Sequence, residues 1–343
     1  MTRIAFVGGG TGGHLTPAIG IAEELIARGH QVEFWLSGRE VEQNYVKSGF
    51  VQRSLKIDYS KLPKKLAVLV AATRVQKYRW RFKPDVVVSL GGYGGAAAIA
   101  AWPRPIICLE GNVVAGKSVR YLSRIAAATL VMFSETATEV PRAKVVGPIS
   151  RLASQISCRE QAAAKFGLDP SRPILLTMGG SQGAVALNQS IIDLMPQLQS
   201  SGWQLLALTG AGKSEAMAVA AHECSINSCI LEHCDDVGAA YSCADLMVSR
   251  GGASTLAEVW LNEIPTFVMP YHHADRQQQL NAEQLAPGVK IFDGSCEAKQ
   301  MLMSAVDSPE IRTRMRDALK KMLVTDGKGI ACDSIEEIAA ARQ

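Results

Sequence analysis

The chain has 343 residues, of which 48% are hydrophobic, 20% charged and 6% aromatic. Because domains typically contain roughly 100 to 200 residues, this length predicts two domains, and the composition excludes a disordered, collagen-like or coiled-coil chain. The net charge of +4 is too small to indicate a nucleic-acid binder, and no apolar run approaches the roughly 18 residues that a membrane-spanning helix needs.

Strand-like and helix-like segments alternate along the chain from its first residues. Residues 4–7 form an apolar run before glycines, residues 16–28 have helical periodicity closed by Gly29, and residues 31–36 are again strand-like. Further strands are expected at 86–90, 105–109, 143–146, 174–178, 204–208, 245–249 and 266–269. This alternation is typical of an α/β protein with doubly wound parallel sheets.

The stretch between the two series of strands is poor in strand signals and contains prolines. We therefore expect a first domain at 1–147, a linker at 148–172 and a second domain at 173–343. The last helix of the second domain could pack against the first domain.

Glycine clusters occur in matched pairs after predicted strands. Residues 7–13 resemble residues 178–183, and residues 89–94 resemble residues 249–254. Two similar Rossmann-like halves facing each other would place all four loops at the carboxyl ends of strands, on either side of a cleft, where such sheets bind ligands.

The first glycine loop suits an anion. A helix start after glycines exposes N–H groups at the positive end of the helix dipole, and the missing Cβ lets a phosphate approach closely. Gly8, Gly10 and Gly13 also satisfy the dinucleotide pattern G-x-G-x-x-G. No acid follows the second strand to hold a ribose, but Arg39 could meet a 2′-phosphate. An NADP-dependent oxidoreductase therefore stays open as an alternative.

A transferase explains the glycine loops better. His14 directly follows Gly13 at the predicted helix start and is a candidate general base. Phosphate-type loops in both halves suit two phosphorylated ligands that meet across a cleft, whereas one cofactor and a small substrate would need only one such loop.

The richest single segment is 250–258. Arg250, Ser254 and Thr255 supply charge and donors at a helix start for a diphosphate, and Glu258 lies one turn further on, where it could accept ribose hydroxyls. No Asp-x-Asp pair occurs in the sequence. We therefore expect helix ends and Arg250, without a metal, to meet the charge of the leaving group.

The cysteines predict neither disulfides nor a metal site. There are eight, without a Cys-x-x-Cys pair, which favours a reducing cytoplasm. The histidines and cysteines between 222 and 234 do not have the spacing of a common zinc motif. After Arg3 only residues 4–7 are apolar before the glycines, so no signal peptide is expected.

Residues 56–83 concentrate positive charge. They carry nine basic side chains against one acid, Asp58, with apolar residues such as Leu69 and Trp80 between them. This arrangement suits an interface of anionic headgroups and acyl chains, although a solvated helix with its inner face in the core is the alternative.

Four motifs in order give the chain a resemblance that extends from residue 4 to about residue 340. They are residues 9–18 (GGTGGHLTPA), 179–184 (GGSQGA) with Asn188, 250–258 (RGGASTLAE) and 270–281 (PYHHADRQQQLN). In these motifs the sequence resembles the MurG glycosyltransferases, which attach N-acetylglucosamine to lipid I, the undecaprenyl-diphosphate-linked muramyl-pentapeptide, and so form lipid II.

The resemblance implies a fold, a reaction and a location. The fold is GT-B, with the acceptor in the N-terminal half, UDP-N-acetylglucosamine in the C-terminal half, and inversion at the anomeric carbon. The reaction belongs to peptidoglycan synthesis, on which cell shape and division depend, and needs no cofactor. The enzyme would lie peripherally on the cytoplasmic face of the membrane, held through residues 56–83, and would bind no nucleic acid.

The resemblance also implies roles for individual residues. His14 would be catalytic. Cys234 would offer its backbone to uracil, and Glu258 would contact the ribose. The donor-binding residues would be Thr11, Gly12, Gly13, Asn112, Arg151, Ser181, Gln182, Cys234, Arg250, Ala253, Ser254, Thr255, Leu256, Ala257, Glu258 and Gln277. The acceptor-binding residues would be Gly10, Tyr93, Gly94 and Asn281.

The chain departs from the family pattern in three places. The usual Gly-Gly-Tyr-Val-Ser reads 91–95 Gly-Gly-Tyr-Gly-Gly, the usual Glu-Gln-Asn has Gly111 in the middle, and the arginine after Pro148 is shifted to Arg151. These departures leave open an acceptor other than lipid I, such as diacylglycerol or a secondary metabolite. They also leave open whether Arg151 reaches the donor phosphates.

Overall fold

The computed structural model describes residues 1–9, 12–38, 42, 50–57, 63–151, 158–180, 184–271, 276–322 and 326–341. The chain forms two compact units, Met1–Arg151 with Thr325–Gln343 (unit 1) and Leu152–Val324 (unit 2). The chain therefore crosses from unit 1 to unit 2 and returns, and its last helix, α15 (Gly327–Ala340), belongs to unit 1.

Within the described residues, unit 1 contains a parallel sheet with the order β3-β2-β1-β4-β5-β6-β7. Its strands are β1 (Arg3–Val7), β2 (Gln31–Leu36), β3 (Val51–Ser54), β4 (Val86–Ser89), β5 (Ile106–Glu110), β6 (Ala128–Val131) and β7 (Ala143–Val145). Its other helices include α1 (Gly12–Ala27), α3 (Lys64–Phe82), α4 (Gly92–Ala96), η1 (Ala97–Ala101), α5 (Lys117–Leu122) and α6 (Ser134–Ala137).

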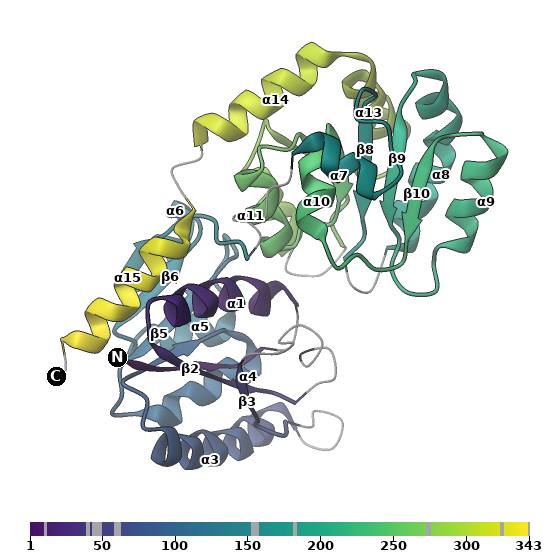
Figure 1. The fold of residues 1–343 in the computed structure, drawn as a ribbon. Coiled ribbons are helices and arrows are strands. Elements are labelled where there is room, and N and C mark those ends of the chain that lie inside the picture. Colours follow the sequence, from purple (N-terminus) through teal and green to yellow (C-terminus); the bar gives the residue numbers. More distant parts are fainter. Residues whose placement is uncertain are drawn as a thin grey trace. The chain divides into compact units, whose positions relative to one another are not determined.

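The sheet of unit 1 is buried on both faces because alternate residues of each strand point to opposite sides. Ile4 and Phe6 of β1 join the core under α1 and α15, while Ala5 and Val7 join the core under α3. Figure 1 shows α1 and α15 together on one face of this sheet and α3 on the other. The C-terminal helix thus closes the core of the N-terminal unit.

Within the described residues, unit 2 repeats this plan with a sheet of order β10-β9-β8-β11-β12-β13, all parallel. The strands are β8 (Ile174–Met178), β9 (Gln204–Leu208), β10 (Ser228–Leu231), β11 (Leu246–Ser249), β12 (Thr266–Val268) and β13 (Val289–Ile291). The helices include α7 (Arg159–Lys165), α8 (Val185–Ser200), α9 (Glu215–Glu223), α10 (Val237–Cys243), α11 (Ala253–Leu261), α12 (Gln277–Glu283), α13 (Cys296–Asp307) and α14 (Pro309–Met322).

The two sheets confirm the predicted class, a pair of doubly wound α/β domains. Four strands carried no clear sequence signal, namely β3, β6, β10 and β13. Three of them are edge strands of three or four residues that are partly exposed. Such short edges lack the long apolar run of a central parallel strand.

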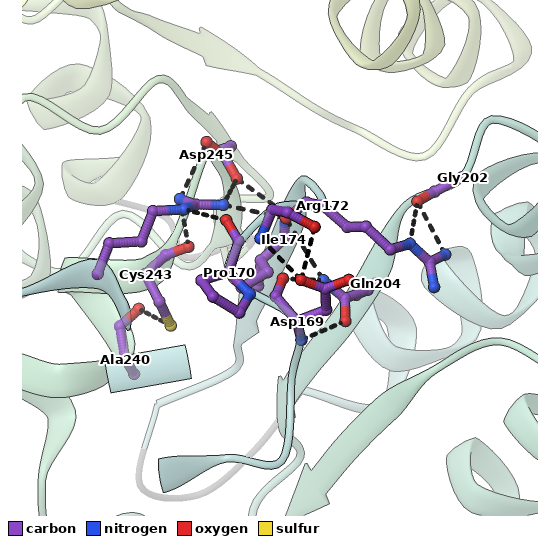
Figure 2. Close-up of polar contacts among 11 residues, drawn as sticks. Asp169, Pro170, Arg172, Ile174, Gly202, Gln204, Ala240, Cys243 and Asp245 are labelled. Carbon is purple, nitrogen blue, oxygen red and sulfur yellow. Dashed lines mark hydrogen bonds and ion pairs between the residues drawn. The ribbon is translucent and has the colours of Figure 1, made fainter. Parts of the chain in front are cut away.

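Helix α7 lies inside the stretch 148–172, where the sequence predicted only a linker. It packs against α10 and belongs to unit 2. The guanidinium of Arg159 in α7 donates to the carbonyls of Pro170, Arg172 and Cys243 and to both carboxylate oxygens of Asp245, at 2.8–3.2 Å (Figure 2). Asp245 also accepts from the N–H of Ile174 at 2.8 Å. This network fastens α7 to the amino ends of β8 and β11.

No helix among the described residues combines the length and apolarity required to cross a membrane.

Candidate active site

The loop after β1 begins the candidate site in unit 1. Gly8 and Gly9 have φ of +116° and +131°, a region that favours glycine. A Cβ on Gly8 would lie 2.8 Å from the backbone nitrogen of Gly95, so this loop is in backbone contact with α4. Glycine is therefore required at position 8 both for its conformation and for this close approach.

His14 lies in the first turn of α1 and is partly buried. A Cβ on Gly91 would lie 3.8 Å from both Cδ2 and Nε2 of the imidazole, so the ring lies against the loop after β4. The two glycine loops of unit 1 lie at the carboxyl ends of strands, as the sequence predicted, and the structure adds that β1 and β4 are adjacent and that His14 lies against the second loop.

Glu110 organises the loop after β5. It is 5% exposed. Its Oε1 accepts from the backbone N–H and from Nδ2 of Asn112, both at 2.9 Å, and its Oε2 accepts from the N–H of Gly116 at 2.7 Å. The Asn112 amide, predicted to contact the donor, is thus held by the carboxylate at the end of β5.

The electrostatics of this edge favour a neutral imidazole. Burial lowers the pKa of His14, and the negative charge of Glu110 opposes part of that shift. Burial and the same carboxylate raise the pKa of the neighbouring Cys108 thiol to about 12. A neutral His14 can accept a proton near pH 7, whereas Cys108 stays protonated and buried.

In unit 2, Arg250 follows β11 directly. It donates from Nη1 to the carbonyl of Met269 at 3.1 Å, and its guanidinium carbon lies 5.4 Å from the centre of the Tyr271 ring. A Cβ on Gly251 would lie 2.4 Å from the carbonyl oxygen of Gln278, so the start of α11 is in backbone contact with α12. The predicted donor segments at 250–258 and 277 are thereby brought together.

Glu258 is buried on α11, with 7% exposure. Its Oε2 accepts a hydrogen bond of 2.7 Å from the hydroxyl of Tyr241, which lies on α10 and is 2% exposed. Burial, followed by the negative charge of Glu258, raises the pKa of Tyr241 well above its usual value. The phenol therefore stays protonated and acts as the donor in this pair.

The remaining predicted residues divide into three groups. Gly10, Thr11, Ser181 and Gln182 lie outside the described residues, and of Gly12 only the backbone is described. Gly13, Tyr93, Cys234, Ala253, Ser254, Thr255 and Gln277 retain some exposure. Gly94, Leu256, Ala257 and Asn281 are buried. A ligand contact at Leu256 or Ala257 would therefore have to use the backbone.

Arg151 lies in unit 1, where its guanidinium is 2.9 Å from Oε1 of Glu23 on α1. A role at the donor phosphates stays a prediction for this residue.

Sequence reasoning missed Tyr241. The only signal was a tyrosine within an otherwise small and apolar stretch, and its partner Glu258 is 17 residues away. No local spacing rule links such positions, because the contact is made between two helices. The role of Glu110 in holding the loop at 111–116 could not be read from the sequence either.

Among the residues that the structure describes, no group of three or more His, Cys, Asp or Glu side chains is arranged to hold a metal ion.

Two doubly wound units with glycine loops at their strand ends fit the GT-B fold, and family models give the class of protein, a glycosyltransferase. The glycosyltransferase family 28 N-terminal domain matches residues 4–131, and the C-terminal domain of the same family matches residues 174–292. These matches support the transferase interpretation of the glycine loops over the dinucleotide one.

Individual relatives are more specific. A UDP-N-acetylglucosamine--N-acetylmuramyl-(pentapeptide) pyrophosphoryl-undecaprenol N-acetylglucosamine transferase of Glaesserella parasuis is 36% identical, covering 83% of this chain and 82% of the relative. One of the same name from Anaeromyxobacter sp. is 32% identical, with 93% and 88% covered. The crystal structure of Acinetobacter baumannii MurG matches with a TM-score of 0.79 and 26% identity over 98% of this chain and 100% of that one. The chain belongs to the MurG family.

Proposed function

We propose that this chain transfers N-acetylglucosamine from UDP-N-acetylglucosamine to lipid I and so forms lipid II for peptidoglycan. The observation that carries the proposal is 32–36% identity, over most of the chain, with relatives named for this reaction. Phosphate-type loops in both units support it, because the reaction brings together two ligands that each contain a diphosphate.

The donor half of the proposal rests on unit 2. The diphosphate of UDP would lie at the amino end of the nine-residue helix α11, where N–H groups and Arg250 offset its negative charge. The ribose hydroxyls would donate to Glu258. Since the sequence has no Asp-x-Asp pair, we expect EDTA to leave turnover unchanged. Loss of turnover in EDTA with recovery in Mg²⁺ would contradict this account.

The acceptor half rests on unit 1. The 4-hydroxyl of the muramyl sugar attacks the anomeric carbon, the bond from that carbon to the UDP oxygen breaks, and UDP leaves with the electron pair. Neutral His14 takes the hydroxyl proton, which makes the oxygen a stronger nucleophile. The lowered pKa of His14 supports this role because it favours the unprotonated ring near pH 7.

The test is to supply the purified chain with UDP-N-acetylglucosamine and separate acceptors. We expect donor consumption with lipid I and none with diacylglycerol or without an acceptor. Consumption with diacylglycerol alone would identify another lipid acceptor, in line with the departures at 91–95 and Gly111. Absence of transfer to every acceptor would contradict the function.

We further propose that α3 and η1 of unit 1 dock on anionic membrane, where an undecaprenyl acceptor resides. These two elements pack together, and Leu69 and Trp80 of α3, Ile99 of η1 and Trp102 directly after η1 are 51–70% exposed. Arg79 contacts both tryptophans. It donates to the carbonyl of Trp102, and its guanidinium carbon lies 5.2 Å from the centre of the Trp80 ring.

The charges around these apolar side chains suit the same surface. Lys77, Arg81 and Lys83 are exposed, and each basic residue near an anionic membrane contributes about 1 kcal/mol. The side chains of Lys64 and Lys65, also expected to contribute, are not among those described.

Matched charge reversals test the docking surface. Lys77→Glu with Arg81→Glu should weaken binding to phosphatidylglycerol vesicles by about tenfold or more and leave UDP affinity unchanged. Lys320→Glu with Lys321→Glu on α14 changes the net charge equally at exposed positions of unit 2. If both pairs weaken vesicle binding to the same extent, total charge is responsible and the segment is a solvated face.

A further inference from the structure

The structure contains a buried polar pair in unit 2, of which the proposed reaction uses only Glu258. Tyr241 is 2% exposed and Glu258 is 7% exposed. The Tyr241 hydroxyl donates to Oε2 of Glu258 at 2.7 Å. Burying a carboxylate and a hydroxyl is costly, and well-packed apolar residues of similar size are often as stable or more stable. Fold stability alone therefore does not explain the pair.

The position of the pair relates it to the nucleotide. Glu258 is on the helix whose first turn is the expected diphosphate site, and Tyr241 is on α10, which follows Cys234, the residue expected at uracil. The start of α10 is fixed because Asp236 accepts from the N–H of Ala239 at 3.0 Å and pairs with Lys165 at 2.5 Å. The Tyr241 hydroxyl is thus held by one well-anchored helix against the carboxylate of another.

We propose that Tyr241 is a positioning residue that makes unit 2 selective for ribonucleotides over 2′-deoxyribonucleotides. Its hydroxyl donates to Oε2 of Glu258 and fixes the rotation of the carboxylate to which the ribose hydroxyls would donate. This inference rests on the proposed function because it takes the ligand of unit 2 to be a uridine diphosphate.

The energetics give the direction of the effect. A hydrogen bond to a charged acceptor is worth more than one between neutral groups, and a buried carboxylate that loses a donor reorients or takes up a proton. Either change weakens acceptance of the 2′-hydroxyl. A nucleotide without that hydroxyl has less to lose, so the variant should bind UDP less well and dUDP almost as before.

The experiment is calorimetric titration of the full chain with UDP and with dUDP. The wild type should prefer UDP by about tenfold or more, and Tyr241→Phe should lose most of that preference through weaker UDP binding. Thr266→Val is the matched control, because it removes a buried hydroxyl of unit 2 that donates to the carbonyl of Ile264 at 2.8 Å. The control should lower thermal stability and keep the wild-type ratio.

A double variant separates positioning from packing. If Tyr241 acts through Glu258, adding Tyr241→Phe to Glu258→Gln should change the UDP to dUDP ratio by less than about twofold. If Tyr241→Phe does not fold, the ratio is measured with Glu258→Gln alone, which must then lose the preference for UDP.

The outcomes are distinct. An unchanged ratio in Tyr241→Phe overturns the inference, as does equal binding of UDP and dUDP by the wild type; both leave the proposed transferase intact. Failure of the wild type to bind either nucleotide contradicts the proposed function itself.

Discussion

The carboxyl edges of the two sheets share a topology and differ in their chemistry. In unit 1 a glycine loop leads into α1, and its first turn presents the partly buried His14, whose pKa burial lowers, against the loop after β4. In unit 2 a glycine loop leads into α11, and Arg250 directly precedes that loop. Glu258 of α11 is buried and accepts a hydrogen bond from Tyr241 of α10. The doubly wound sheet supplies a location for ligands, and a few side chains decide whether that location suits proton transfer or nucleotide binding.

The glycines of the two edges perform the same structural task with different partners. Gly8 allows the loop after β1 to contact the backbone of Gly95, and Gly251 allows the start of α11 to contact the backbone of Gln278. In each unit a missing Cβ sets the distance between two segments predicted to bind substrate.

The largest effect should come from His14→Ala in unit 1. Loss of a general base typically lowers the rate by about 10²- to 10⁴-fold, so kcat should fall by that order while UDP binding in unit 2 is unchanged. His222→Ala, at an exposed position on α9, is the control and should keep wild-type kcat. A His14→Ala variant with more than about a tenth of wild-type kcat would make His14 a positioning residue, with Glu110 the next candidate base.

Arg159→Ala tests the opposite, amino edge of unit 2. The change removes the guanidinium that donates to both carboxylate oxygens of Asp245, and three backbone carbonyls lose a donor, two of them on the labelled Pro170 and Cys243 of Figure 2. Because the pair is about one quarter exposed, the free energy of unfolding should fall by about 2 kcal/mol. Lys299→Ala breaks a surface pair with Asp193 and should cost at most about 1 kcal/mol. Equal losses in chemical denaturation would show that the Arg159 network adds nothing beyond a surface ion pair.

Gly251→Ala and Gly252→Ala form a matched pair at the carboxyl edge. A Cβ at position 251 would lie 2.4 Å from a backbone oxygen, whereas at position 252 the nearest atom is 3.9 Å away, on Thr255. Overpacking of this kind costs about 1–3 kcal/mol, so thermal unfolding should show destabilisation for Gly251→Ala only. Equal melting temperatures for both variants would contradict the close contact between α11 and α12.

The smallest expected effect is a displacement of the pH profile. Because burial lowers the pKa of His14, the base form persists to lower pH, and the acidic limb of kcat/KM should lie below about pH 6.5, the ordinary histidine value. The limb should be absent in His14→Ala. The same shift means that the unfolded chain takes up this proton first, so the contribution of neutral His14 to stability is lost as pH falls below that value. An acidic limb above pH 6.5 would show that Glu110 outweighs burial.

Much of the fold was predictable because its signals are local. The central strands are continuous apolar runs ended by glycine, and the glycine loops at 7–13 and 89–94 predicted the carboxyl edge of the first sheet. The edge strands β3, β10 and β13 were missed because three or four partly exposed residues carry too little periodicity. Helix α7 was missed for a different reason, since its place in unit 2 depends on Arg159 contacts with residues up to 86 positions away.

By itself the sequence determined the two doubly wound halves, the glycine loops, and the candidate residues His14, Arg250 and Glu258, because these depend on residue type and short spacing. Only the tertiary structure decided which groups set the pKa and the orientation of the functional side chains. Burial lowers the pKa of His14, the N–H groups of Asn112 and Gly116 donate to the carboxylate of Glu110, and the hydroxyl of Tyr241 donates to that of Glu258. Desolvation and hydrogen bonding act between atoms that folding brings together, and no local pattern in the chain encodes which atoms those are.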